Sequence, residues 1–229
     1  MKIKDSDICV IIPVYNEEKR IRKVLDDLLT STDCRIVVVD DGSTDKTFAI
    51  ASNIKKVIVL RHKINQVKSK GAAMKTGCEY AFDHLHCKAV IFMDGDGQHL
   101  PSDLPKFIEK LGLGYDIILG SRNFNLNIPL VRYLGNKTAS IVINLLFSKY
   151  VSDLLCGFRA ITKTAYEQIK WDSVGYGVET EMVVNMARTN LRWCEVPVTV
   201  LYYDKAKGVS ILDAFGILFD VIKWRFFKG

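Results

Sequence analysis

Residues 89–99 read Ala-Val-Ile-Phe-Met-Asp-Gly-Asp-Gly-Gln-His, an apolar run that turns abruptly into an acidic, glycine-rich loop. The apolar part is typical of a buried strand, and Asp94 and Asp96 follow its end. Residues two apart in an extended chain point to the same side, so the two carboxylates can converge on one ligand. Their oxygen atoms suit Mg²⁺ or Mn²⁺, although a simple Asp/Gly turn after a strand has the same composition.

The flanking sequence alternates between strand-like and helix-like patterns. Strands are expected at 8–13, 36–39, 57–60, 89–93, 117–119 and near 196–202, and helices at about 17–29, from Ser43 or Thr44 onward, at 71–85, 130–147 and 179–189. This order predicts an α/β fold with a mostly parallel central sheet and helices on both faces. Such sheets bind ligands at the carboxyl ends of their strands, where Asp40-Asp41 and Asp94/Asp96 both fall.

The composition fits one large globular domain. The chain has 229 residues, 48% of them hydrophobic, and a formal net charge of +6, which is compatible with an anionic substrate or an anionic membrane surface. No nucleic-acid-binding motif occurs, so nucleic acid is not an expected partner. The six cysteines are scattered without a Cys-x-x-Cys pair and are interpreted as reduced thiols of a cytoplasmic protein. The absence of a signal peptide and of an apolar run of about 20 residues predicts a soluble or peripheral protein.

Four ordered motifs carry a resemblance to a known family. They are Ile11-Ile-Pro-Val-Tyr-Asn-Glu17, Val38-Val-Asp-Asp-Gly-Ser-Thr-Asp45, Asp94-Gly-Asp-Gly-Gln-His99 and Gly120-Ser-Arg122. Together they resemble the family 2 glycosyltransferases, which have a GT-A (Rossmann-like) fold. Asp153 with Cys156-Gly-Phe-Arg159, and Gly175-Tyr-Gly-Val-Glu-Thr-Glu181, are similar to the branch of dolichol-phosphate mannose synthase and related polyprenyl-phosphate sugar transferases. The resemblance implies a GT-A catalytic domain over residues 1–210.

The resemblance also implies a donor site in the first half of the chain. In the family, the loop after the first strand embraces the base and ribose of a nucleotide-sugar, and here that loop carries Pro13, Val14, Tyr15 and Glu17. Glu17 would accept a hydrogen bond from a sugar hydroxyl. Alternatively, Pro-Val-Tyr shapes the turn and Glu17 begins a helix, where an acidic residue is favoured by the dipole.

Further donor contacts are expected from the acidic strand ends. Asp41 would accept a base N–H, Asp94 would touch the ribose or the metal, and Asp96 would hold Mg²⁺ or Mn²⁺ on the diphosphate. Gln98 is a further candidate metal ligand in the same loop. Relatives often carry Asn-x-Gly-Lys-Gly before the next helix, whereas this chain has Asn65-Gln-Val-Lys-Ser-Lys-Gly71. The altered loop leaves Lys70 as a candidate substrate-binding residue.

The acceptor side of the site is expected to be cationic. Guanidinium groups match phosphate oxygens bidentately, which makes Arg122, Arg132 and Arg159 candidates for binding an anionic acceptor or the donor diphosphate. Surface charge explains Arg132 equally well. Asp153 could be the base for a hydroxyl acceptor. A phosphate acceptor is already anionic, however, and Asp153 would then position other groups.

Two further acceptor-side candidates come from the second half of the chain. Glu181 matches the family motif better than Glu179, for which a helix-start role is equally suitable. Relatives often show an Arg ahead of Gly-x-Ser, whereas this chain offers Lys205 and Lys207. Lysine keeps the charge but loses the bidentate fork, so a phosphate contact of Lys205 would be less directional.

The last segment, residues 211–229, is expected to be a C-terminal amphipathic helix. Its apolar residues at helical spacing are Ile211, Phe215, Leu218, Ile222 and Phe226. Such a helix can lie in a membrane interface, which suits an enzyme with a lipid acceptor, or it can pack on its own core. A peripheral position on the cytoplasmic face of a membrane is the prediction.

The complete expectation is a metal-dependent inverting glycosyltransferase. It would move a sugar from a nucleotide-sugar of the GDP-mannose or UDP-glucose type to a polyprenyl or dolichyl phosphate. One alternative is a family 2 enzyme that uses a sugar or protein hydroxyl. The other is a non-catalytic nucleotide-sugar binding module.

Overall fold

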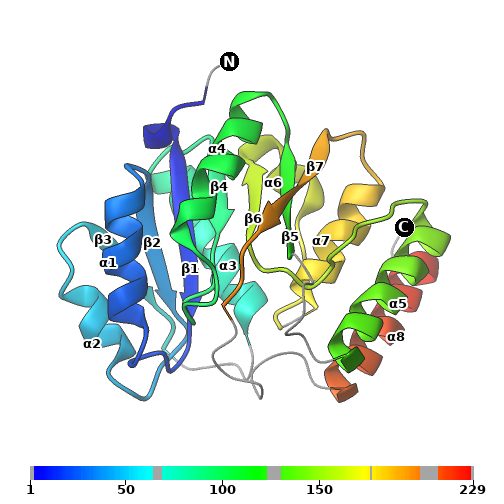
Figure 1. Ribbon diagram of the computed structural model, residues 1–229, viewed down its shortest axis with the longest axis horizontal. Helices are drawn as coiled ribbons and strands as arrows, with labels where there is room; N and C mark the ends of the chain where they lie inside the picture. Colours follow the sequence, from blue (N-terminus) through cyan, green and yellow to red (C-terminus); the bar gives the residue numbers. More distant parts are fainter. Residues whose placement is uncertain (1–2, 64–68, 123–129, 176, 202–210, 228–229) are drawn as a thin grey trace.

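The computed structural model of the chain describes residues 3–63, 69–122, 130–175, 177–201 and 211–227 (Figure 1). Within these ranges, seven strands form one sheet in the order β3-β2-β1-β4-β6-β5-β7. The strands are β1 Ile8–Val14, β2 Arg35–Asp40, β3 Val57–Arg61, β4 Ala89–Phe92, β5 Ile117–Arg122, β6 Arg159–Thr162 and β7 Trp193–Val198. Only β6 runs antiparallel to its neighbours in this sheet, β4 and β5. The predicted mostly parallel sheet is confirmed.

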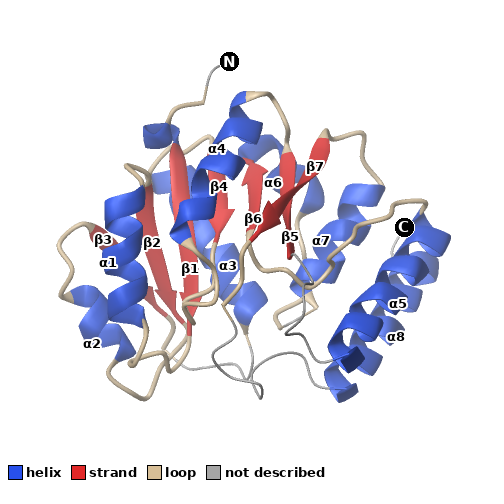
Figure 2. Ribbon diagram, in the orientation of Figure 1, coloured by secondary structure: helices blue, strands red, loops and turns tan. Residues whose placement is uncertain are grey.

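Helices cover both faces of the sheet (Figure 2). They are α1 Ile21–Ser31, α2 Thr47–Ser52, α3 Lys70–Glu79, α4 Leu104–Gly112, α5 Leu130–Phe147, α6 Lys163–Ile169, α7 Val178–Ala187 and α8 Ile211–Phe227. In the orientation of Figure 1, α1 and α4 lie in front of the sheet, whereas α3 and α6 lie behind it. Helices α5 and α8 lie side by side at one edge of the molecule and contact each other and α7.

The strand sequences explain this two-sided burial. Along β1, Ile8, Val10 and Ile12 belong to the apolar core on the side of α1 and α4. Cys9 and Ile11 alternate with them and belong to the core on the side of α3. Because both faces of this strand are buried, the side chains on both faces are apolar. The strand sequence is therefore a continuous apolar run.

Two helix starts differ from the sequence-based expectation. Helix α2 begins at Thr47, and not at Ser43 or Thr44, because Asp45 Oδ1 accepts the hydrogen bond of the Thr47 N–H at 2.9 Å. Helix α1 begins at Ile21, so Glu17 lies in the turn before it. The Glu17 carbonyl accepts hydrogen bonds from the backbone N–H groups of Arg20 and Ile21 in that turn.

Candidate active site

The predicted donor residues gather at one edge of the sheet. Strands β1, β2 and β4 are parallel neighbours, so the loops after Val14, Asp40 and Phe92 leave the sheet on the same side. This is the lower edge of the sheet in Figure 1. Ligand sites of parallel α/β sheets form at this edge. The structure therefore brings Asp41 and Asp94 to either side of β1.

The loops after β1 and β2 are joined by Asn16, a residue that the sequence analysis missed. Asn16 has a positive φ of 54°, which asparagine tolerates better than most residues. Its side-chain oxygen accepts the Thr44 N–H at 2.9 Å, and its own N–H donates to Ser43 Oγ at 3.0 Å. The neighbouring Tyr15 is 45% exposed, so its ring is accessible beside the joined loops.

Pro13, Val14 and Glu17 frame the same loop. Pro13 and Val14 are the last two residues of β1, and the Val14 side chain is buried. Glu17 is also largely buried, and its carboxylate lies 3.4 Å from the guanidinium of Arg20. Its backbone N–H donates to Thr47 Oγ1 at 2.7 Å, which ties the loop to the start of α2.

Asp41 is held by partners from two other elements. Its carboxylate lies 2.8 Å from Nδ1 of His62, which follows β3, and it also accepts the hydroxyl of Ser69, which precedes α3. Because a carboxylate only accepts, His62 Nδ1 donates to it, and His62 Nε2 lies 3.0 Å from the Thr76 hydroxyl. Asp41 is nearly fully buried, so these bonds fix its orientation.

Asp94 is paired with Lys70. The Lys70 ammonium lies 2.6 Å from Asp94 Oδ1 and 2.7 Å from Glu179 Oε1. Burial would raise the pKa of Asp94, but the charge and the hydrogen bond of Lys70, together with other nearby cationic groups such as Arg122, hold that pKa at about 2. Burial would also lower the pKa of Lys70, yet the two carboxylates raise it above its ordinary value. Asp94 and Lys70 are therefore both charged at neutral pH.

Asp96 occupies a different electrostatic environment two residues later. Burial and then the neighbouring Asp94 charge raise the pKa of Asp96 to about 6. Its Oδ1 accepts the backbone N–H of Gln98 at 2.9 Å. His99 packs at a tilt against the Phe158 ring, accepts the Asp94 N–H at Nδ1, and has its pKa lowered by burial. A neutral His99 with this lone pair occupied is a packing residue.

These residues fit a divalent cation that shares its ligands with the substrate. No cluster of three or more His, Cys, Asp or Glu side chains suited to a metal occurs in the described ranges. Two neighbouring carboxylates, with the pKa of Asp96 raised by burial and by the Asp94 charge, match a site where Mg²⁺ or Mn²⁺ is completed by water and phosphate oxygens. Asp96 is the better ligand, because Asp94 already accepts from the Lys70 ammonium.

Arg122 stands at the end of β5 and is held by Asp153. Its Nε lies 2.6 Å and its Nη2 2.8 Å from the two Asp153 oxygens, and its backbone N–H donates to the same carboxylate. Asn136 of α5 donates to Asp153 at 3.1 Å and accepts the Leu154 N–H. Asp153 is completely buried, so this geometry favours the positioning role over the role of a base.

Arg159 lies inside the protein, and its predicted phosphate contact stays a prediction. Its side chain is completely buried. The guanidinium donates to the backbone carbonyls of Leu154, Cys156 and Glu179. Those bonds use its donors on the protein itself, so Arg159 shapes the segment between Asp153 and β6.

Glu181 is likewise buried, and its predicted substrate contact stays a prediction. Its buried carboxylate accepts the backbone N–H groups of Asp172 and Ser173. Glu179, two residues earlier on α7, is the residue that reaches Lys70. The sequence contained one signal for this choice, because residues two apart on a helix cannot share a face.

Two candidates lie outside the described parts of the structure. Arg132 belongs to α5, but its side chain is outside the described residues. Lys205 and Lys207 fall in residues 202–210, which are also outside them. Their predicted roles stay predictions.

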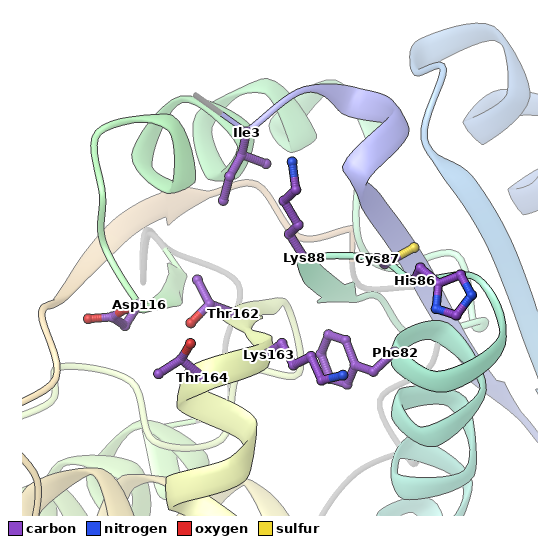
Figure 3. Close-up of a pocket in the computed structure, with 9 residues that line it drawn as sticks. All are labelled: Ile3, Phe82, His86, Cys87, Lys88, Asp116, Thr162, Lys163 and Thr164. Atoms are coloured by element: carbon purple, nitrogen blue, oxygen red, sulfur yellow. The ribbon is translucent and has the colours of Figure 1, made fainter. Parts of the chain in front are cut away.

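A cavity of about 420 Å³ lies at the opposite end of the sheet (Figure 3). Lys88 and Asp116, which precede β4 and β5, line it together with Phe82, Thr162 and Lys163. It contains none of the predicted site residues. The candidate active site is thus confined to the carboxyl edge.

Comparison with known proteins agrees with this geometry. The model of the family described as "Glycosyl transferase family 2" matches residues 9–169. The chain is 31% identical over 249 residues to UDP-N-acetylglucosamine--dolichyl-phosphate N-acetylglucosaminyltransferase of Methanococcus voltae, covering 98% of each. It is 28% identical over 229 residues to polyprenol monophosphomannose synthase of Mycolicibacterium smegmatis, covering 94% of this chain and 85% of that protein.

A solved structure supports the fold. Glucosyl-3-phosphoglycerate synthase from Mycobacterium tuberculosis, in complex with Mn²⁺, uridine diphosphate and phosphoglyceric acid, superimposes with a TM-score of 0.75 and 19% identity. The match covers 95% of this chain and 78% of that one. The predicted GT-A fold is confirmed by this likeness.

Proposed function

This chain belongs to the family 2 glycosyltransferases, and from that premise we propose that it transfers a sugar from a nucleotide-sugar to a polyprenyl phosphate with inversion. The observation that carries the proposal is the pairing of two sites at one sheet edge. Asp41 and Asp94/Asp96 flank β1 on the donor side, and Arg122 stands at the end of β5 in the same edge. The relatives from Methanococcus voltae and Mycolicibacterium smegmatis are named for transfer to dolichyl phosphate and for polyprenol monophosphomannose synthesis.

The chemistry needs little from the protein beyond positioning and charge. An acceptor phosphate oxygen attacks the anomeric carbon from the face opposite the diphosphate, and the bond from that carbon to the diphosphate oxygen breaks. The attacking oxygen is already anionic, so no base has to remove a proton. This agrees with an Asp153 carboxylate that is buried and occupied by Arg122. Arg122 then offers its positive charge to phosphate.

Asp96, with Asp94 and Gln98 as the other candidates, would hold a Mg²⁺ or Mn²⁺ ion. When bound, such an ion neutralises the leaving diphosphate. The donor nucleotide and sugar are proposed only as a class, UDP-linked or GDP-linked. Asp41 would contribute a fixed hydrogen-bond acceptor for the base.

A lipid acceptor requires access to a membrane, and α5 and α8 offer an exposed apolar surface for this. No helix within the described residues is both long and apolar enough to span a bilayer. The exposed side chains on these helices include Leu145 at 76%, Phe219 at 69% and Phe226 at 70%. We therefore place the peripheral membrane contact of the proposal on these two helices.

The test is nucleoside diphosphate release from a panel of GDP- and UDP-sugars with Mn²⁺ or Mg²⁺, with and without a short polyprenyl phosphate. Lipid-dependent release from one donor is the expected result. Asp96→Ala should lower that rate by more than about 100-fold, whereas Asp26→Ala, at an exposed position of α1, should not change it. Release that ignores the lipid, together with loss of rate in Asp153→Asn on a bell-shaped pH profile, would favour a hydroxyl acceptor instead. Donor binding without turnover on any acceptor would indicate a binding module.

A further inference from the structure

Two consecutive residues at the start of α3 each contact one of the donor-side carboxylates. Ser69 donates its hydroxyl to Asp41 at the end of β2. Lys70 donates to Asp94 after β4. We propose that Ser69 and Lys70 are positioning residues that hold Asp41 and Asp94 for the donor, and that Glu179 sets the charge of the Lys70 contact. This inference rests on the proposed function, because it takes the two carboxylates as donor-binding groups.

The Ser69 contact orients the Asp41 carboxylate and leaves acceptor sites on it for a ligand. Ser69 is 1% exposed, so its hydroxyl has no water to bond with and points to the carboxylate. His62 Nδ1 occupies the other oxygen at 2.8 Å. Each carboxylate oxygen has two acceptor sites, so one remains on each for a base N–H. The two bonds therefore orient Asp41 and leave it able to bind.

The Lys70 contact would neutralise Asp94 if it stood alone. Glu179 prevents this, because it lies 2.7 Å from the same ammonium and is only 5% exposed. Two carboxylates and one ammonium carry one net negative charge among these three groups, which the buried Arg159 guanidinium beside Glu179 partly offsets. That charge lies beside Asp96 and favours a cation or the hydroxyl donors of a ribose. Glu179 thus acts on the donor site through Lys70.

Two glycines let the backbone approach this cluster closely. A Cβ on Gly157 would lie 2.5 Å from Asp94 Oδ2 and 2.8 Å from Lys70 Nζ. A Cβ on Gly71 would lie 2.1 Å from the Ser173 carbonyl oxygen. Both glycines permit a close approach that any other residue would prevent. The start of α3 is therefore locked between β1, the Gly157 segment and the segment before α7.

If Ser69 and Glu179 had a purely structural role, they would make the same contacts. Their substitution would then not affect nucleotide binding and Mn²⁺ binding selectively. Two probes of the two carboxylates distinguish the readings. Metal-free UMP and GMP, followed by calorimetry, report on the Asp41 side, and Mn²⁺ alone, followed by electron paramagnetic resonance, reports on the Asp94/Asp96 side. Neither measurement requires turnover.

Ser69→Ala should weaken binding of the preferred nucleoside monophosphate about tenfold and leave the Mn²⁺ affinity unchanged. Glu179→Gln should lower the Mn²⁺ affinity about tenfold and leave nucleotide binding unchanged. The neutral amide no longer shares the Lys70 charge, so that charge acts on Asp94 alone. Ser69→Thr, which keeps the hydroxyl, should restore nucleotide binding. Glu167→Gln, at an exposed position of α6, should change neither affinity.

The outcomes separate this inference from the proposed function. A wild-type protein that binds neither nucleotide nor Mn²⁺ would overturn the proposed donor site itself. Wild-type binding with folded Ser69→Ala and Glu179→Gln proteins of unchanged affinity would overturn only the positioning roles, as would variants that weaken both probes equally. If either variant unfolds in thermal melts, Ser69→Gly and Glu179→Ala repeat the comparison under the same criteria.

Discussion

Arg122 and Arg159 carry the same charge, yet their surroundings give them different tasks. Arg159 is completely buried and donates to backbone carbonyls. Arg122 lies at a strand end with a side chain that is 21% exposed and pairs with Asp153. A guanidinium bound to carbonyls stabilises the fold, whereas one at a sheet edge can meet a ligand. Exposure, and not residue type, separates the two.

Arg159→Met should therefore destabilise the protein before it affects chemistry. The substitution leaves the carbonyls of Leu154, Cys156 and Glu179 without their charged donor, so we expect the free energy of unfolding to fall by about 2–5 kcal/mol. Urea denaturation measures this change. A variant with wild-type stability and a selective loss of affinity for polyprenyl phosphate would return Arg159 to the acceptor site.

Asp153→Asn should reduce turnover through Arg122. An asparagine retains the shape but not the charge that holds the guanidinium, so kcat/KM for polyprenyl phosphate should drop by more than about tenfold. The pH profile of the remaining activity should keep its wild-type shape, because no proton is taken from the acceptor. Loss of one limb of that profile would show instead that Asp153 is the base.

The sequence alone was sufficient to place the acidic residues that directly follow the end of a strand. Asp41, Asp94 and Asp96 could be placed because β2 and β4 are recognisable and their carboxyl ends meet at one edge. The partners of these residues could not be placed. Glu179 lies far along the chain from Lys70 and Asp94, and only the packing of α7 beside the Gly157 segment brings the three together. Arg159 and Glu181 are completely buried, and no local sequence pattern indicates that burial.

At the scale of elements, α3 is the part that depends most on close packing. Its Gly71 and Gly77 face the Ser173 carbonyl and the Ile11 side chain, where a Cβ would lie 2.1 Å and 2.5 Å from the nearest atom. The helix contacts β1 and β2. Small residues on this face explain how Ser69 and Lys70 come within reach of the strand ends.

Gly71→Ala should consequently destabilise the protein, whereas Gly135→Ala should not. The added methyl at Gly71 collides with a backbone carbonyl that cannot move independently, so we expect a loss of about 1–3 kcal/mol. Gly135 lies on an exposed part of α5 with nothing within 4 Å of a Cβ, so alanine should stabilise it by about 0.4–1 kcal/mol. Chemical denaturation of both variants checks the contrast. Equal effects would mean that α3 can shift outward without cost.

Element prediction failed where tertiary contacts set the boundaries. Strand β6 was not expected, because it has only four residues, starts at the last residue of the Cys-Gly-Phe-Arg segment, and pairs non-locally with β4 and β5. Helix α2 starts late because Ser43 and Thr44 bond to Asn16 across the loop. By contrast, α5 was predicted with its observed bounds, since a long apolar pattern leaves little choice.

At the scale of the whole molecule, α8 combines the two interpretations that its sequence allowed. Val221 and Trp224 are buried in the core that α7 shares. Phe219, Ile222 and Phe226 are exposed on the same helix at a spacing of three and four residues. The helix therefore packs on its own protein with one stripe and leaves a second apolar stripe to the surroundings. Helix α5 does likewise, with Ile143 buried and Leu134, Ile141 and Leu145 exposed.

These two stripes should bind the chain to anionic membranes. The net charge of +6 attracts an anionic surface, and burying exposed phenylalanines in the interface adds up to about 1.5–3 kcal/mol for each side chain. Replacing Phe219 and Phe226 together with serine should lower the binding to phosphatidylglycerol-containing vesicles at least about tenfold in a flotation assay. Leu113→Ser, at an exposed position after α4, is the matched control. Nucleotide and Mn²⁺ affinities depend on Asp41 and Asp96, which lie at the carboxyl edge of the sheet and not on α8. Both affinities should therefore be unchanged in the double variant. Equal flotation of the double variant and the wild type would assign the exposed stripes to another partner.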